Sequence, residues 1–298
     1  MRINNRIISN NILQNLQRNL NQLSKVQDQM SSGKRVSKPS DDPIGVAQIL
    51  SFKTTIAEQE QHIKNMEDAK SWIDLSESAL DNATAVLQRA RELSVYGASD
   101  SMPDDSRKAL ANEADQLVEE LVQVANAIYG DRYVFGGSIT DKPPFEYDAS
   151  GPAVNYRGNN SSLQWEVAPG VELKVNATGE EVFDRTASSS IPSMFQAIIN
   201  LAENLRNGNA EASISEIDAE IDHILSQRAI MGAKSNRLRL SQERMENDQI
   251  NNTKLMSKLE DVDLAKVSME YSIQSNVYQA ALQTGARIIQ PTLLDFLR

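Results

Sequence analysis

The sequence predicts a mainly α-helical protein with a small β insertion, built as a long antiparallel coiled-coil rod whose N- and C-terminal helices pair. Three observations carry this prediction. Apolar residues recur every seven positions in both halves of the 298-residue chain. The stretch between the two halves is rich in turn residues and alternates apolar with polar positions. Aromatic residues make up only 5% of the chain, and long packed helices are served by aliphatic side chains.

The first predicted helix lies before residue 31, where leucines recur at helical spacing: Leu13, Leu16, Leu20 and Leu23. The polar stretch "SSGKRVSKPSDDPIG" at 31–45 follows it. Gly33 is a stop signal, because glycine adopts a left-handed C-cap without steric cost. Asp42 is a candidate N-cap for a second helix that begins at Pro43, where a missing N–H does no harm.

The second predicted helix runs from Pro43 to about Tyr96 and contains no glycine or proline after Gly45. Two sets of sevenfold positions pass through it with an offset of three, which is the a/d pattern of a coiled coil: Ile49, Ile56, Ile63 and Met66, Ile73, Leu80, Leu87. At 1.5 Å per residue such a helix is roughly 80 Å long. Gly97 is expected to end it.

A third helix is expected from a cap at Asp100 or Ser101 to a stop at Gly130. Its apolar residues step by three or four positions: Leu110, Ala114, Leu117, Leu121, Val124 and Ile128. The next stretch, 131–190, reads as a β domain that folds as a unit. Turn signals such as "DKPPF" and "DASGP" separate the β-prone runs "RYVF", "AVNY", "SLQWEVA", "VELKV" and "EEVF". Trp165 is its expected core anchor.

Helical pattern resumes at Pro192 and continues to a stop near Gly208. A second heptad run then follows, with an offset pair at Ile214 and Ile221: Ile217, Ile224, Met231, Leu238 and Met245. The pattern blurs in "NDQINNTK" and returns at Leu255. This run predicts the second long helix of the rod.

Both chain ends are poor in charge. Residues 1–27 contain no Asp or Glu, and residues 271–294 contain one charge, Arg287. Asparagine, a weak helix former, occupies seven of the first 21 positions. The ends either pair as an ordinary helical hairpin or become helical only when packed against other copies. We favour the second interpretation, because apolar surface would stay uncovered on an isolated two-helix pair.

Composition excludes several functions. A net charge of −11 argues against binding the phosphate backbone of nucleic acids. No run approaches 18 apolar residues, so no membrane insertion is expected. The chain has no cysteine and two histidines, His62 and His223, with no metalloprotease motif. We therefore expect no enzyme activity, no cofactor and no metal. The charged N-terminal stretch has no continuous apolar run, so we expect no cleaved secretory signal peptide.

Three stretches in order resemble the flagellin family: "SSGKRVSKPSDDPIGVAQ" at 31–48, "LQRARELSV" at 87–95, and the last 40 residues from "LEDVDLAKV" onward. Within the family, "YVFGGSITDKPPF" at 133–145 is similar to members that join the hook to the filament of the bacterial flagellum. The resemblance implies an inner terminal domain (1–42 and 255–298), a helical rod domain (43–130 and 191–254) and an outer β domain (131–190).

The resemblance also implies a structural subunit that self-assembles through its terminal helices. Its expected partners are other copies in a ring, the preceding hook-associated protein, flagellin and an export chaperone that binds the C-terminal segment. It implies an extracellular place at the hook–filament junction after type III export without a cleaved signal peptide. The expected assembly interface is Leu13, Leu16, Leu20, Leu23, Val277, Leu282, Ile288, Ile289, Leu293 and Leu294, and the expected rod contacts are Leu87, Arg89, Arg91 and Glu92.

Two alternatives stay open at this point. The first is a filament flagellin of the same family. The second, of a different class, is a non-flagellar coiled-coil scaffold or signalling rod, which explains the heptads but neither the charge-poor ends nor the β insertion.

Overall fold

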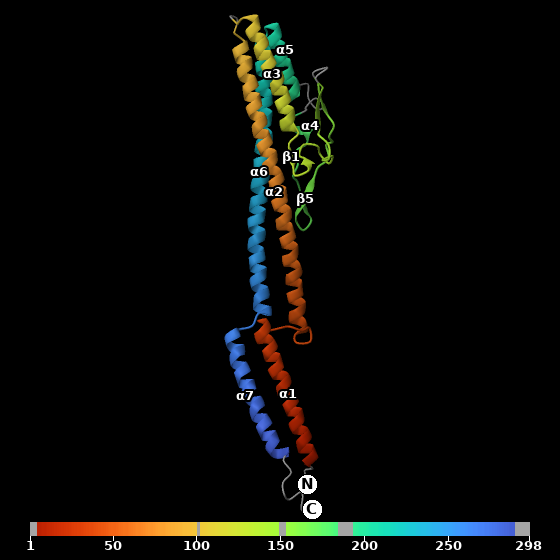
Figure 1. The fold of residues 1–298 in the computed structure, drawn as a ribbon, viewed down its shortest axis with the longest axis vertical. Coiled ribbons are helices and arrows are strands. Elements are labelled where there is room, and N and C mark those ends of the chain that lie inside the picture. The colour runs from red at the N-terminus through yellow and green to blue at the C-terminus, as the bar shows by residue number, and fades with distance from the viewer. Residues whose placement is uncertain (1–4, 100–101, 149–152, 184–192, 290–298) are drawn as a thin grey trace, which may run out of the picture. The chain divides into compact units, whose positions relative to one another are not determined.

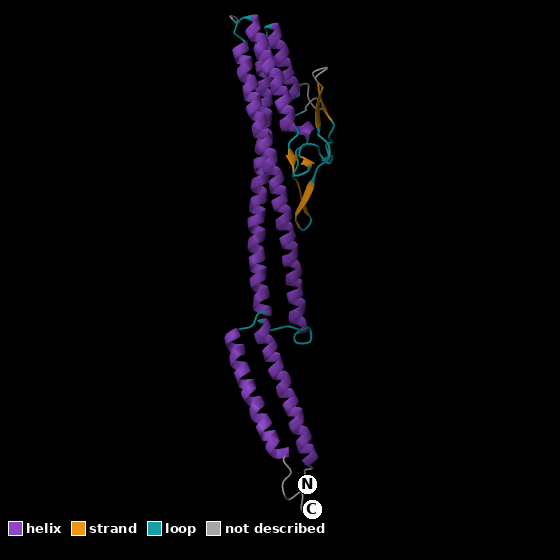
Figure 2. Ribbon diagram, viewed as in Figure 1, coloured by secondary structure: helices purple, strands orange, loops and turns teal. Residues whose placement is uncertain are grey.

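The structure, a computed structural model, describes residues 5–99, 102–148, 153–183 and 193–289. The described chain is mainly helical, with short strands confined to one insertion (Figures 1 and 2). Its residues group into two compact units, which are described separately: Met1–Glu58 with Asp248–Arg298, and Gln59–Asn247. The helices α2 (Pro43–Gly97) and α6 (Glu211–Glu260) each contribute to both units.

In the first unit, α1 (Asn5–Ser32) pairs with α7 (Leu264–Ile289). The predicted boundaries of the first two helices are confirmed. Gly33 follows α1 with a left-handed φ of 69°. Asp42 Oδ1 accepts a hydrogen bond of 2.9 Å from the Gly45 backbone N–H, which makes Asp42 the N-cap of α2.

In the second unit, α2 and α6 run antiparallel. Arg228 on α6 pairs with Asp81 on α2 at 2.8 Å, and Asp218 on α6 pairs with Arg91 on α2. The partner residue number on α6 falls by ten as the residue number on α2 rises by ten, which is the register of antiparallel helices. Three of the predicted heptad positions in this unit, Ile63, Ile214 and Ile221, are partly buried. The others are buried along both helices: Met66, Ile73, Leu80, Leu87, Ile217, Ile224, Met231, Leu238 and Met245. The predicted antiparallel coiled coil is therefore confirmed here.

Two shorter helices complete the helical part of this unit. α3 (Asp104–Ala125) packs against α5 (Met194–Asn207), which Ser193 caps at its start and Gly208 ends with a φ of 76°. The expected cap of α3 at Asp100 or Ser101 is wrong, because its N-cap is Pro103. The expected stop at Gly130 is also wrong: α3 ends at Ala125, and Gly130 instead takes the left-handed turn of a hairpin.

The described residues of the insertion form three separate antiparallel strand pairs rather than one sheet. They are β1 (Ile128–Tyr129) with β2 (Arg132–Tyr133), β3 (Phe145–Asp148) with β4 (Ala153–Tyr156), and β5 (Gln164–Ala168) with β6 (Val171–Lys174). The expected strand at "EEVF" is wrong. These residues lie in the short helix α4 (Gly179–Val182) and its C-cap, since Thr178 and Glu181 form a capping box.

The insertion shares its core with the helices. Phe183 contacts Phe135 and Phe145 with ring centroids 5.0 and 5.5 Å apart, and Phe195 of α5 lies 5.1 Å from Phe145. The side chain of Asn126, at the end of α3, donates to the Phe145 carbonyl and accepts from its N–H. Residues 131–190 therefore share their aromatic core with a helical residue, and their folding as a unit of their own stays a prediction.

Trp72 of α2 is the buried indole of this region, with 2% of its surface exposed. Its ring lies 5.7 Å from Tyr129 and 6.0 Å from Trp165, so two of the strand pairs rest on it. Trp165, the expected core anchor, is only partly buried. The anchor of the insertion is therefore supplied by α2, outside the insertion.

Replacing Trp72 tests this assignment. Trp72→Ala should lower the free energy of unfolding by about 3–5 kcal/mol, as for other fully buried large side chains, and Trp165→Ala should cost clearly less. Chemical denaturation followed by helical circular dichroism measures both. An equal or larger cost for Trp165→Ala would contradict the assignment.

Candidate assembly surfaces

The pair α1–α7 is held by a narrow seam. Leu16 and Leu23 of α1 are partly buried on it, and Val26 and Val267 are buried near the loop end of the pair. The helices approach closely at Gly285, where an added Cβ would stand 3.0 Å from the Ile12 side chain. A seam of this kind covers one stripe of each helix and leaves the flanks to solvent.

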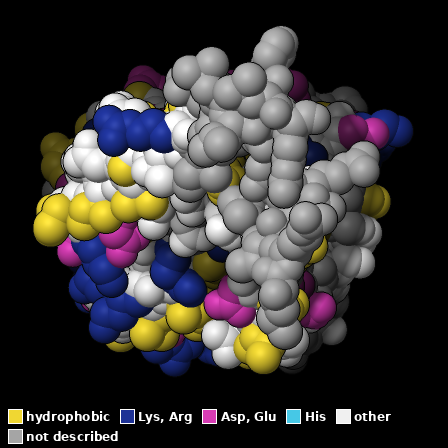
Figure 3. Space-filling view, turned by 90° about the horizontal axis from the view of Figure 1, so that it is seen from below, with side chains coloured by type: hydrophobic (Ala, Val, Ile, Leu, Met, Phe, Trp, Pro, Cys, Tyr) yellow, Lys and Arg dark blue, Asp and Glu magenta, His cyan; other side chains and the backbone are white. Residues whose placement is uncertain are grey.

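Large apolar side chains lie exposed on those flanks. Leu13 is 57% and Leu20 41% exposed on α1, and Val277 is 44% and Leu282 43% exposed on α7. Met269 and Ile273 extend the exposed set along α7. The space-filling view from below shows hydrophobic side chains at the surface beside Lys and Arg (Figure 3). Exposed apolar residues grouped on neighbouring helices are typical of a surface that another chain covers.

The structure thus divides the ten residues expected at the assembly interface. Leu16 and Leu23 belong to the seam within the chain, whereas Leu13, Leu20, Val277 and Leu282 remain available to a partner. Ile288 and Ile289 lie in the last turn of α7, with side chains that the structure does not describe, and Leu293 and Leu294 lie outside the described residues.

Two loops are locked together beside this pair. The α1–α2 loop meets the junction of α6 with α7 through backbone hydrogen bonds: Arg35 N–H donates to the Glu260 carbonyl at 2.6 Å, and Val262 N–H donates to the Gly33 carbonyl at 3.0 Å. The Arg35 guanidinium donates to the Leu259 carbonyl at 2.9 Å. Both chain connections of the first unit are therefore fixed at one place, which we call the loop clamp (33–36 and 259–262).

Glu260 is the buried carboxylate of the loop clamp. Only 6% of the surface of Glu260 is exposed. Its Oε1 lies 2.6 Å from Lys34 Nζ and 2.9 Å from Lys53 Nζ. Burial by itself would raise its pKa, but the hydrogen bonds and charges of Lys34 and Lys53 outweigh burial, and the pKa is lowered below the ordinary 4.5. Sequence reasoning missed this residue, because its partners lie more than 200 positions away.

The expected rod contacts occupy different environments. Arg89 pairs with Glu92 at 2.8 Å and Glu113 at 2.6 Å, and these side chains are partly exposed. Arg91 and Glu92 line a groove of about 660 Å³ together with the exposed Val95 and Tyr96. Leu87 has no exposed surface, because it belongs to the bundle core, so the structure corrects its expected role as a subunit contact.

Neither histidine lies in a chemical site among the described residues. His62 Nδ1 is 3.4 Å from the Glu166 carbonyl, and His223 Nε2 is 3.0 Å from the Glu181 carbonyl, so each contacts the insertion. No group of three or more His, Asp or Glu residues in the described ranges is arranged to hold a metal ion. None of the described helices is both long and apolar enough to cross a membrane.

The exposed apolar flanks on paired terminal helices define a helical subunit of a self-assembling structure. The chain belongs to the flagellin family. The family model for the bacterial flagellin N-terminal helical region matches residues 3–140, and the model for the C-terminal helical region matches residues 214–297. Proteins of this family are structural subunits.

Similar proteins fall in two groups of this family. The chain is 28% identical to flagellar hook-associated protein 3 of Salmonella typhimurium over 87% of this chain and 88% of that protein. It is also 28% identical to a flagellin of Halalkalibacterium halodurans, over 95% of this chain and 93% of the other. Its fold matches the flagellar junction protein FlgL from Legionella pneumophila with a TM-score of 0.59 at 21% identity, over 72% of this chain and all of that one.

Through Glu260 of the loop clamp, the free energy of unfolding should depend on pH. Because the pKa of Glu260 is lowered in the folded state, its contribution is fully present above pH 4.5 and is lost as the pH falls through the lowered pKa. Glu260→Gln should therefore lower the melting temperature at pH 7, and the difference from the parent chain should shrink below pH 4.5. Glu270→Gln, at an exposed position of α7, is the matched control. A difference between parent and variant that stays constant down to pH 3 would refute the assignment.

Proposed function

We propose that this chain is the structural subunit that joins the hook to the filament of a bacterial flagellum. The observation that carries the proposal is the row of exposed apolar residues on both terminal helices, on a chain that matches hook-associated protein 3 over nearly its full length. Burial of apolar surface is the general driving force of association, and these flanks offer it to neighbouring copies.

The assembly would follow the layers expected from the sequence: an inner terminal domain (1–42 and 255–298), a rod domain (43–130 and 191–254) and an outer domain (131–190). In this proposal Leu13, Leu20, Val277 and Leu282 contact neighbouring copies, and Ile288, Ile289, Leu293 and Leu294 extend that surface. Arg89, Arg91 and Glu92 form the corresponding contact of the rod.

The proposal also concerns partners and place. Copies of the chain form a ring, with the preceding hook-associated protein on one side and flagellin on the other. An export chaperone binds the C-terminal segment before assembly, and the chain reaches the outside of the cell without a cleaved signal peptide. The chain acts without catalysis, cofactor or metal, because association alone performs the joining.

A second candidate is the filament flagellin itself. It is favoured by the equal identity of 28% to the flagellin of Halalkalibacterium halodurans over almost all of both chains. The two candidates differ in where copies add. A junction subunit adds to hook ends and stops at a ring, whereas a flagellin continues to polymerise. Electron microscopy of purified chain added to hook ends separates them, and long filaments of this chain alone would contradict the junction proposal.

Changes at an exposed and at a seam leucine should have different effects. Leu13→Asp places a carboxylate on the exposed flank of α1, so it should leave the thermal unfolding of the isolated chain nearly unchanged and abolish joining at hook ends. Leu16→Asp places the charge on the α1–α7 seam and should also destabilise the pair, by several kcal/mol if the carboxylate stays buried. Motility and electron microscopy measure joining.

Asn21→Asp is the control for added charge, because it lies at an exposed polar position of α1. It should join normally. If Leu13→Asp also joins hook to filament normally, the exposed flank is not an assembly surface and the proposal loses the observation on which it depends.

A further inference from the structure

The loop clamp lies within the first unit, where the chain passes between two pairs of helices. The chain runs from α1 to the start of α2 through residues 33–42, and from the end of α6 to α7 through residues 261–263. Lys34 and Asp261 form an isolated antiparallel bridge between these two connections. The clamp therefore joins both of the connections through which the α1–α7 pair is attached to α2 and α6.

Side chains tie the clamp to α1, α2 and α6. Gln29, in the last turns of α1, donates a hydrogen bond of 2.8 Å to the Arg35 carbonyl. The Arg35 guanidinium donates to the carbonyl of Leu259 at the end of α6, where the last carbonyls have no partner within the helix. Lys53 of α2 reaches Glu260 at 2.9 Å. Three helices are thus held at one place by contacts between residues far apart in the sequence.

Apolar side chains from each segment around the clamp are buried as well. One comes from α1, one from the α1–α2 loop, one from α2 and one from α7: Val26, Val36, Ile49 and Val267. Each of the four segments therefore has a packed side near the clamp, and the polar contacts do not stand alone.

Glu260 is the residue that the charged contacts of the clamp share. Its Oε1 lies against the Nζ atoms of both Lys34 and Lys53, so the two ammonium groups are held close together. Without the carboxylate these like charges would repel each other. Desolvation offsets much of the stability that a buried ion pair contributes, and the best-attested role of such a pair is to select one arrangement of the chain. The contacts of Glu260 therefore suit a residue that sets geometry.

We propose that Glu260 is a positioning residue for assembly, which through the loop clamp fixes the direction in which the α1–α7 pair leaves the ends of α2 and α6. This inference rests on the proposed junction function and names the residue on which its geometry depends. Copies form a regular assembly only if each presents its contact surfaces in the same orientation. A change at Glu260, whose side chain is buried in the clamp, then weakens joining without altering the exposed flanks.

A distance measurement between spin labels tests the geometry without any assembly. The chain has no cysteine, so Asn15→Cys on α1 and Ala57→Cys on α2 provide two exposed labelling sites within the first unit. Double electron–electron resonance on the labelled parent chain should give a single narrow distance distribution. Glu260→Gln should give a broad one at a temperature well below its melting transition. A residue that only adds stability would leave the distribution narrow there.

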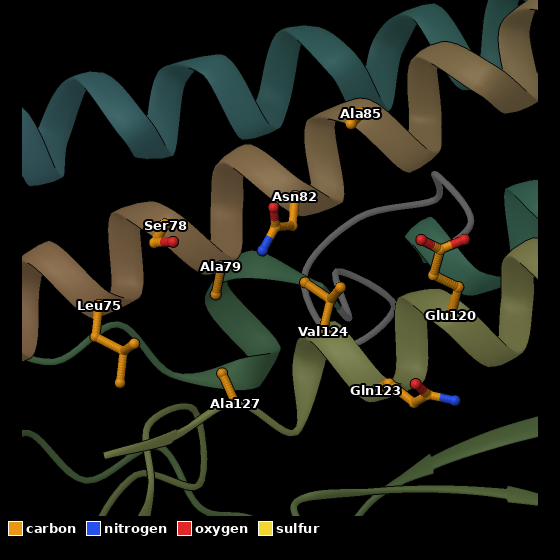
Figure 4. A pocket seen from close by; sticks show the side chains of 9 residues that line it. All are labelled: Leu75, Ser78, Ala79, Asn82, Ala85, Glu120, Gln123, Val124 and Ala127. Atoms are coloured by element: carbon orange, nitrogen blue, oxygen red, sulfur yellow. The ribbon is translucent and has the colours of Figure 1, made fainter.

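Control variants accompany this measurement. Lys34→Arg keeps the cation and should keep the narrow distribution. Glu120→Gln removes a carboxylate from the second unit, where Glu120 lies exposed on the wall of a groove of about 540 Å³ between α2 and α3 (Figure 4). It should behave as the parent chain does. Lys53→Gln removes one of the two cations and should broaden the distribution less than Glu260→Gln. Circular dichroism verifies that each variant is helical, and Lys53→Gln carries the test if Glu260→Gln does not fold.

A disulfide can close the same clamp without the carboxylate. Lys34 and Asp261 are a non-hydrogen-bonded antiparallel pair, because the backbone hydrogen bonds of the clamp lie on either side of them. Such a pair has its Cα atoms about 4.5 Å apart, within the range that a disulfide spans. Lys34→Cys and Asp261→Cys are therefore combined with Glu260→Gln, and the purified chain is added to hook ends. The oxidised chain should join, and the reduced chain should lose most joining, as Glu260→Gln alone does under both conditions.

The outcomes separate the positioning role from the proposed function. If Glu260→Gln keeps a narrow distribution, or joins normally although its distribution is broad, Glu260 does not position the pair for assembly. If the disulfide forms, as mass spectrometry verifies, and the oxidised chain still does not join, the positioning role is also wrong. In each of these cases the junction function stands. If the parent chain does not add to hook ends, the junction function fails, and the distance measurement still decides whether Glu260 fixes the direction of the pair.

Discussion

The narrow seam along the long helices is the constraint on which the rest of the structure depends. A heptad pattern buries one stripe of each helix against one antiparallel partner, as the ion pairs Asp81–Arg228 and Arg91–Asp218 and the buried residues Ile73 and Ile224 show. Such a stripe buries only part of the surface of each helix. In the second unit α3, α5 and the insertion cover more of it, whereas in the first unit the flanks of α1 and α7 remain open.

This difference between the units suits a subunit that must be stable alone and also associate. The second unit has an aromatic and aliphatic core that closes on itself around Trp72 and Phe145. In the first unit, the ion pairs of Glu260 with Lys34 and Lys53 hold the loop clamp together. The apolar flanks of its helices remain exposed in the single chain. In the proposed assembly, the core of the second unit supplies most of the stability, and the apolar flanks of the first unit supply the main contact with other copies.

Local signals in the sequence predicted much of this fold. Gly33, the Asp42–Pro43 start and Gly208 mark helix ends by backbone conformation and capping, which depend on a few neighbouring residues. Contacts between residues far apart in the sequence were not predicted. Trp72 lies next to a heptad position, and its neighbours in the sequence do not indicate that Tyr129 and Trp165 pack on it. The loop clamp joins Lys34 to Glu260, and β3 follows two prolines that read as a turn. The sequence predicted the leucines of α1 as one group of interface residues, and their division into seam and flank needed the pairing of α1 with α7.

Amide hydrogen exchange tests the central claim most directly, namely that the flanks of the terminal helices are covered only by other copies. The account predicts that residues 5–32 and 264–289 exchange faster than the heptad run in the dilute chain, because one narrow seam holds the pair, and that they become strongly protected in hook–filament particles. The heptad run from Ile217 to Met245 should be protected in both states. Equal and strong protection of the terminal helices in the dilute chain would contradict the account.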